Sequence, residues 1–198
     1  MTTYIPALTI PYGVFANPAA SVLLPIGLGA GIGYSTRPKV QEKQTQWNHI
    51  KEAPGRPPPW VFGPAWTCLY GLMGYAAHRA ITNGLSPITS TPELIRATKH
   101  SATLYTVQLA LNMAWMPLYF GLKRPIEATV DIVALLGVNV YLTKLWWSID
   151  RTAAYCMFPY LGWLSFATYL CAGAGYLNGW SFQGKEVRSS RTGTDKQQ

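Results

Sequence analysis

Charge is scarce in this chain, and its scarcity argues against an ordinary soluble domain. Only 12% of the 198 residues are charged, whereas soluble domains average about 25%. Apolar residues make up 49% of the chain and gather in windows of about 20 residues, long enough to cross about 30 Å of hydrocarbon. The sequence therefore predicts an all-α membrane protein, a bundle of five transmembrane helices.

The predicted spans form one domain. They cover residues 14–34, 60–80, 98–120, 126–147 and 153–177, inside a transmembrane domain of residues 1–180. Residues 181–198 are polar, and we expect them to form a cytosolic tail.

Basic residues are absent from the N-terminal segment, where no Lys or Arg precedes Arg37. A signal peptide needs a basic n-region, and a mitochondrial presequence needs arginines on an amphipathic helix. We therefore expect residues 1–36 to remain in the mature protein.

Cysteine and histidine are also few. The three cysteines all fall in predicted spans: Cys68, Cys156 and Cys171. Cys156 and Cys171 would lie about 22 Å apart on one helix, beyond disulfide reach. The three histidines are scattered without an HxxxH or CxxC pattern, so metal and haem ligation have little support. We expect no cofactor and no metal site.

The basic excess, 16 Lys and Arg against 8 Asp and Glu, falls mainly on one face of the predicted bundle. That face holds Arg37, Lys39, Lys43, Lys51, Arg56, Lys123, Arg124, Lys185, Arg188, Arg191 and Lys196. The positive-inside rule makes this face cytosolic, with the C-terminus inside. The excess indicates topology and contact with anionic membrane lipids. Nucleic-acid binding is not expected, because no basic stripe is interleaved with exposed aromatics.

Prolines mark the start of the second span. The run Pro57–Pro59 favours an extended approach, and Pro64 would lie in about the first turn of the helix, where its missing N–H costs little. Before the third span, two start signals are open: Ser90 capping with Glu93, or Thr91 capping with a proline at the first helical position.

Aromatic residues recur at helical spacing on three predicted spans. The faces are Trp66, Tyr70 and Met73; Asn112, Trp115 and Tyr119; and Tyr160, Trp163, Ala167 and Leu170. Core packing is the commoner reason for such faces. An interfacial belt explains four further tryptophans well: Trp60, Trp146, Trp147 and Trp180. It explains the mid-span tryptophans poorly, so a ligand site is the alternative.

Asp131 lies near the start of the fourth span. A carboxylate inside a membrane is costly and is a functional hypothesis by default. No chain of acids or histidines accompanies it, so we favour a structural role, through a hydrogen bond or the helix dipole, over proton transfer.

Small residues four apart favour close helix contacts. Gly27 and Gly31, and also Ala110 and Ala114, have this spacing. We therefore predict a homodimer.

Four blocks in fixed order resemble one known family. They are "PPPWVFGPAWTCLYGLMGY" (57–75), "ALNMAWMPLYFG" (110–121), "ATVDIVALLG" (128–137) and "FPYLGWLSFATYL" (158–170). Together they resemble the translocator protein / tryptophan-rich sensory protein family, also called the peripheral-type benzodiazepine receptor family.

The resemblance implies a five-helix bundle with an internal hydrophobic ligand pocket, open to the cytosolic side and covered by the first loop. It implies binding of porphyrins such as protoporphyrin IX, and in animals of cholesterol and benzodiazepine-type ligands. It also implies a dimer contact at Ala110 and Ala114, as in bacterial relatives. Eukaryotic members mostly reside in the mitochondrial outer membrane, and bacterial members in the cell envelope.

The resemblance, joined to the aromatic faces, gives the predicted ligand-binding set. It comprises Trp60, Phe62, Gly63, Trp66, Tyr70, Asn112, Trp115, Tyr119, Asp131, Tyr160, Trp163, Ala167 and Leu170. The chain departs from the family pattern at three positions that usually hold tryptophan in the family or its animal members: Gly55, Met113 and Glu127.

The sequence thus predicts a membrane receptor or carrier for porphyrins or other hydrophobic small molecules, linked to tetrapyrrole or sterol transport and stress response. One alternative is an enzyme that degrades porphyrin with light and oxygen, with Trp66 and Trp163 as its catalytic residues. Another is a membrane scaffold without ligand chemistry.

Overall fold

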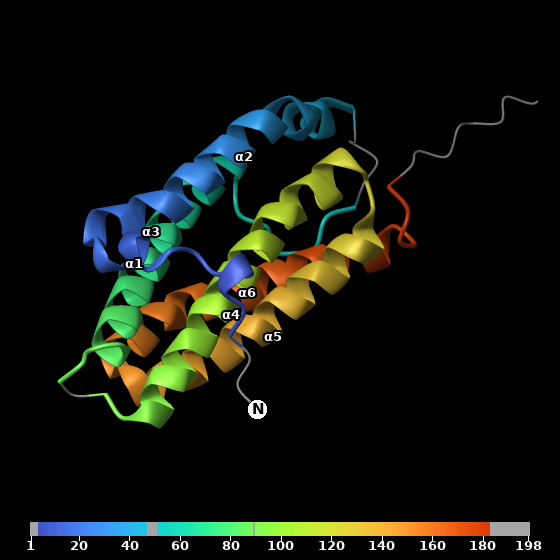
Figure 1. Cartoon of the computed structure of the whole chain (residues 1–198). Coiled ribbons are helices and arrows are strands. Elements are labelled where there is room, and N and C mark those ends of the chain that lie inside the picture. Colours follow the sequence, from blue (N-terminus) through green and yellow to red (C-terminus); the bar gives the residue numbers. More distant parts are fainter. Residues whose placement is uncertain (1–3, 47–50, 89, 183–198) are drawn as a thin grey trace, which may run out of the picture.

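The computed structural model describes residues 4–46, 51–88 and 90–182, and every element in these ranges is helical (Figure 1). The long helices are α2 (Pro18–Gln46), α3 (Pro59–Gly84), α4 (Pro92–Met116), α5 (Pro125–Ile149) and α6 (Arg151–Leu177). Three short elements accompany them: η1 (Pro6–Leu8), α1 (Tyr12–Ala16) and η2 (Pro117–Gly121), a π-helical turn that ends α4. The predicted all-α bundle is confirmed. The predicted tail from 183 onward lies outside the described residues.

Two of the long helices satisfy a strict hydropathy criterion for a membrane span. Pro18–Pro38 has a mean hydropathy of 1.3, and Pro125–Ile149 has 1.5. The other three helices, with 26, 25 and 27 residues, are long enough to span about 30 Å. They fall below the criterion because Trp, Tyr, Gly, Thr and amide residues lower their mean hydropathy.

The helix starts follow the proline and threonine signals. Thr91 caps α4 by accepting a hydrogen bond from the Leu94 N–H at 3.3 Å, with Pro92 at the first helical position. The second of the two predicted start signals is therefore the one used. Pro59 opens α3, and Pro64 lies inside that helix beyond its first turn.

The first long helix, α2, continues to Gln46, past the predicted end at Tyr34. The added segment contains Pro38 inside the helix, a residue that usually breaks helices, and continues past it with Gln and Lys, which favour helix. α2 packs along α3 through glycines: a side chain at Gly29 would meet the Tyr70 ring, and one at Gly74 would meet the Ser21 backbone.

The core lies where α3, α4, α5 and α6 face one another. Trp146 is fully buried there, with its ring 6.0 Å from that of Tyr105. The prediction of an interfacial position for Trp146 is therefore wrong. Its neighbour Trp147 is exposed as expected, because consecutive residues on a helix point about 100° apart.

One end of the bundle is fastened by Asp150, which lies between α5 and α6. Arg79 donates to Asp150 Oδ2 at 3.2 and 2.9 Å, Asn83 also donates to Oδ2, and the Ala153 N–H donates to Oδ1 at 2.9 Å. Burial alone would raise the pKa of Asp150, but these hydrogen bonds and the Arg79 charge hold it below its ordinary value. We call the end of the bundle that contains Asp150 the clamp end.

Candidate functional site

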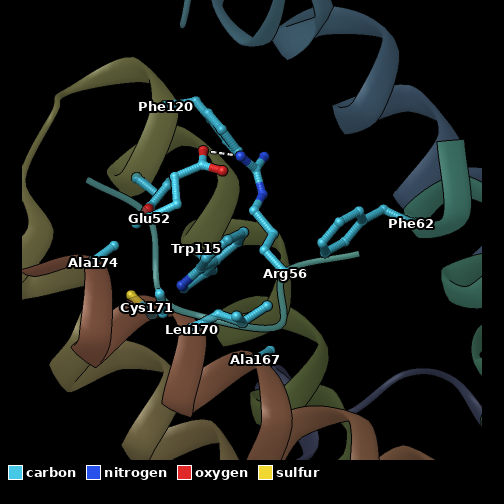
Figure 2. Close-up of a pocket in the computed structure, with 11 residues that line it drawn as sticks. Glu52, Arg56, Phe62, Trp115, Phe120, Ala167, Leu170, Cys171 and Ala174 are labelled. Carbon is cyan, nitrogen blue, oxygen red and sulfur yellow. Dashed lines mark ion pairs between the residues drawn. The ribbon is translucent and has the colours of Figure 1, made fainter. Parts of the chain in front are cut away.

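The opposite end of the bundle contains a pocket. There the segment 51–58 crosses between η2 and the end of α6 (Figures 1 and 2). The empty volume is about 500 Å³, which includes open solvent at its mouth. The lining residues are Glu52, Ala53, Arg56, Phe62, Trp115, Tyr119, Phe120, Ala167, Leu170, Cys171 and Ala174. We call this the pocket end.

Small residues on α6 form one wall. Ala167, Cys171 and Ala174 follow helical spacing and face the pocket together with Leu170. Because three of these four side chains are short, α6 leaves space under the crossing segment.

Aromatic rings form the facing wall. Trp115, on the last turn of α4, stacks on Tyr119 with ring centroids 5.0 Å apart and planes inclined by 16°. Phe120 packs edge-on against both rings. The π-helical turn of η2 places these three rings in one group, which offers a flat ligand a broad apolar surface.

The cover of the pocket is anchored to α6 and the residues after it. Asn178 accepts from the Lys51 N–H at 3.0 Å and donates to the Lys51 carbonyl at 2.7 Å. Tyr169 donates to the Pro54 carbonyl at 3.2 Å. Ala53 is 4% exposed and packs against Gly173. The segment is thus a fixed lid, which we call the loop lid (residues 51–58).

The charged groups among the described lining residues are Glu52 and Arg56, which form an ion pair at the mouth (Figure 2). Gly55 has φ of +80°, a conformation that favours glycine. A tryptophan, which the resemblance leads us to expect here, would rarely adopt this conformation. Burial lowers the pKa of the Arg56 guanidinium, which still remains a cation.

A second aromatic group lies next to the pocket, and its rings pack against one another. Trp66 contacts three rings: Tyr70 at 5.4 Å, Tyr160 at 6.2 Å and Trp163 at 6.3 Å between centroids. Phe62 joins this group to the pocket, since it lines the pocket and lies 5.8 Å from Trp163.

Buried amides fasten this aromatic group. Asn112 accepts from the Tyr70 hydroxyl at 2.6 Å and donates to the Tyr160 hydroxyl at 2.8 Å. The Tyr160 hydroxyl and Asn139 Nδ2 each donate to Gln108 Oε1 at 3.3 Å. Sequence reasoning missed Gln108 and Asn139, although an amide inside an apolar span is itself a signal of such a network.

The predicted ligand-binding residues therefore divide into three groups. Lining the pocket are Phe62, Trp115, Tyr119, Ala167 and Leu170. Forming the second aromatic group beside it are Trp66, Tyr70, Asn112, Tyr160 and Trp163. Outside both are Trp60, Gly63 and Asp131.

The residues outside both groups have different surroundings. Trp60 is 75% exposed on the first turn of α3, and Gly63 is also exposed. Asp131 is half-buried on α5, and its Oδ2 is enclosed without a hydrogen-bond partner among the described residues.

Chemically, the pocket offers stacking surfaces, one cation and one indole donor. Trp115 Nε1 is enclosed and has no acceptor within the described part of the chain. In those same residues, no three His, Cys, Asp or Glu side chains gather. This arrangement suits a flat, largely apolar molecule that carries an acceptor or a carboxylate.

Comparison with known proteins agrees with the resemblance. Residues 21–177 match the TspO/MBR family. The chain is 40% identical over 156 residues to the translocator protein homolog of Schizosaccharomyces pombe, and the aligned region covers 79% of this chain and 88% of the relative. It is 36% identical over 151 residues to the tryptophan-rich protein TspO of Archaeoglobus fulgidus, covering 76% and 90%.

The human relative has a lower sequence identity to this chain. The chain is 34% identical over 154 residues to the translocator protein of Homo sapiens, covering 77% of this chain and 85% of the relative. The matched region contains all four long helices that surround the pocket and the core. The chain therefore belongs to the TspO/MBR family and is an integral membrane bundle of helices.

Proposed function

We propose that this protein is a membrane receptor or carrier for porphyrins of the protoporphyrin IX type, which it binds beneath the loop lid. The observation that carries the proposal is the pairing of stacked aromatic rings with one cation at the mouth of an apolar pocket.

Each part of the pocket matches a part of the ligand. A flat macrocycle stacks on Trp115 and Tyr119, with Phe62 at its edge. A propionate at the mouth accepts charge-assisted hydrogen bonds from Arg56. The pocket is open at its mouth, so part of the macrocycle would stay outside the lined space.

The proposal extends to placement and transport. The pocket end faces the cytosol with the C-terminus, supported by the positive charges of Lys51, Arg56, Lys123 and Arg124 near it. The membrane is the mitochondrial outer membrane in a eukaryote and the cell envelope in a bacterium. The carried ligand links the protein to tetrapyrrole or sterol transport and to stress responses.

Titration with protoporphyrin IX tests the binding proposal. The purified protein is titrated in the dark while tryptophan fluorescence is recorded, and is then illuminated in air. Saturable quenching without a new product supports a receptor or carrier. If porphyrin neither quenches saturably nor reacts, the protein is a scaffold and the proposal fails.

A porphyrin-degrading enzyme is the second candidate. It is favoured by the edge contact between Trp66 and Trp163, with Phe62 linking Trp163 to the pocket wall. O₂ would oxidise the light-excited porphyrin: one C=C bond of the macrocycle would break, and the two oxygen atoms of O₂ would end in two new C=O bonds. Indole is readily oxidised, so these rings would pass an electron reversibly during the step and end in their starting state. Formation of a porphyrin oxidation product in illuminated, aerated samples, and its absence without O₂, would support this candidate.

We also propose a homodimer through α4. Ala110 is exposed on that helix and lies four residues before Ala114, the spacing that lets helices approach closely. Gly27 and Gly31 of α2 also have open space around them and form the alternative contact. Cross-linking of the protein in membranes measures the dimer fraction.

A further inference from the structure

The ion pair at the pocket mouth joins two lining residues of the same loop lid. Glu52 and Arg56 lie four residues apart, and the nine other lining residues are apolar or aromatic apart from the Tyr119 hydroxyl and the Cys171 thiol. Figure 2 shows the two charged side chains meeting at one side of the aromatic rings. In this state the mouth carries no net charge.

Glu52 is the more exposed partner of the pair. Its side chain is 40% exposed, against 28% for Arg56. The backbone of the lid is held on both sides of the pair: Lys51 and Ala53 contact the end of α6, and the stiff run Pro57–Pro59 follows Arg56. On this fixed backbone, the more exposed Glu52 side chain is the one that turns outward to water while the guanidinium stays at the mouth.

Exchange of one carboxylate for another at Arg56 is chemically balanced. A guanidinium binds any carboxylate through the same planar set of donors. A partly exposed ion pair contributes little to stability, so Glu52 gives way to a ligand carboxylate at small cost.

We propose that Glu52 is a built-in competitor for the carboxylate of the ligand, and that it sets how strongly the pocket prefers acidic over neutral ligands. A neutral ligand enters with the Glu52–Arg56 pair intact. An acidic ligand takes the place of Glu52 at Arg56, and its affinity is reduced by the competition. This inference rests on the proposed porphyrin site beneath the loop lid.

Two porphyrins that differ only in charge test the competition. Full-length protein in lipid nanodiscs is titrated in the dark with protoporphyrin IX and with its dimethyl ester. We expect Glu52→Gln to tighten binding of the acid by about twofold to fivefold, the range of an exposed ion pair, and to leave the ester unchanged. Arg56→Gln should weaken binding of the acid and leave binding of the ester unchanged. In the double variant, Glu52→Gln should have no effect beyond that of Arg56→Gln.

The pair Arg124–Glu127 supplies a matched control. It is also a short-range Arg–Glu pair, with 3.2 Å between Nη1 and Oε1, but both side chains are more exposed and neither lines the pocket. Glu127→Gln should leave both porphyrin affinities unchanged. A steeper loss of acid affinity with added salt in Glu52→Gln than in wild type gives a second readout.

The outcomes separate the two proposals. If both porphyrins bind saturably and Glu52→Gln changes neither, or changes both equally, the competitor role is overturned and the porphyrin site stands. If neither porphyrin binds wild-type protein, the proposed function fails and the competitor role fails with it.

Discussion

Both ends of the bundle combine an arginine–carboxylate pair with small residues, but the small residues have different neighbours at the two ends. At the clamp end, Ala76, Ala77 and Ala80 are fully buried, and Gly84 approaches Thr98 and Ile149 so closely that a side chain there would collide with both. At the pocket end, Ala167 and Ala174 of α6 line empty space. Small residues opposite another helix bring the two helices together, whereas small residues opposite a loop leave a hollow.

The two ion pairs differ in the same way. The Asp150 side chain is 5% exposed and accepts hydrogen bonds from Arg79, Asn83 and a backbone N–H. The Glu52 side chain is 40% exposed and pairs with Arg56 across the pocket mouth. We infer that the first pair holds helices together and that the second is available for exchange with a ligand.

The largest effect is expected from loosening the clamp end. Asp150→Asn keeps a side-chain oxygen to cap α6 but removes the charge that faces Arg79. We expect a loss of about 2 kcal/mol in the free energy of unfolding, since hydrogen bonds to charged groups contribute about 1.5–3 kcal/mol. Thermal or denaturant unfolding in detergent measures this loss. Glu93→Gln, at an exposed carboxylate on the first turn of α4, should cost far less.

The pH dependence gives the same test a second readout. Because the folded protein holds the pKa of Asp150 below its ordinary value, its contribution is complete above about pH 4, the unfolded value. The contribution is lost as the pH falls through the lower folded pKa. Wild-type protein should therefore lose this part of its stability only in acid, and Asp150→Asn should lack that component. If both proteins lose the same amount of stability in acid, Asp150 is not the cause of the pH dependence.

A smaller effect is expected from lifting the loop lid. A Cβ added at Gly173 would lie only 2.8 Å from the Ala53 Cβ, so Gly173→Leu should push the lid off α6. Overpacking of this kind costs about 1–3 kcal/mol, and we expect porphyrin affinity to fall by about tenfold while the clamp end is unaffected. Dark quenching titrations measure the affinity.

Gly162 provides the control for that substitution. It lies on the same helix, is exposed, and has open space where a side chain would extend. Gly162→Leu should therefore keep wild-type affinity. Equal losses from both variants would mean that leucine disturbs α6 itself, and the lid would not be the cause.

The smallest effect is expected from trimming one ring of the pocket wall. Trp115→Phe reduces the stacking surface, and we expect a loss of about 1 kcal/mol in porphyrin binding, roughly fivefold in Kd. Trp163→Phe, in the second aromatic group beside the pocket, should weaken binding less. Trp147→Phe, at an exposed position, should not change it. If all three substitutions weaken binding equally, general destabilisation explains the result and the pocket wall is misassigned.

Helical periodicity and local signals were sufficient to predict much of the fold from the sequence. The windows with little charge predict five long helices, and the start of α4 is narrowed to Ser90 or Thr91, of which the structure uses Thr91. Both predictions depend on residues close in the chain. The order of the four aromatic blocks also predicts the family. Each of these features depends on local chemistry, which a sequence states directly.

Tertiary structure alone decided which side chains face empty space. Trp115 and Trp163 each hold the second position of a helix face with i, i+3, i+7 spacing, but Trp115 lines the pocket and Trp163 packs against Trp66. Periodicity tells which residues share a helix face, and it does not tell whether a helix or a loop lies opposite that face. The loop lid is placed by contacts of Lys51 with Asn178 and of Ala53 with Gly173. These partners are more than a hundred residues apart, and no local pattern links them.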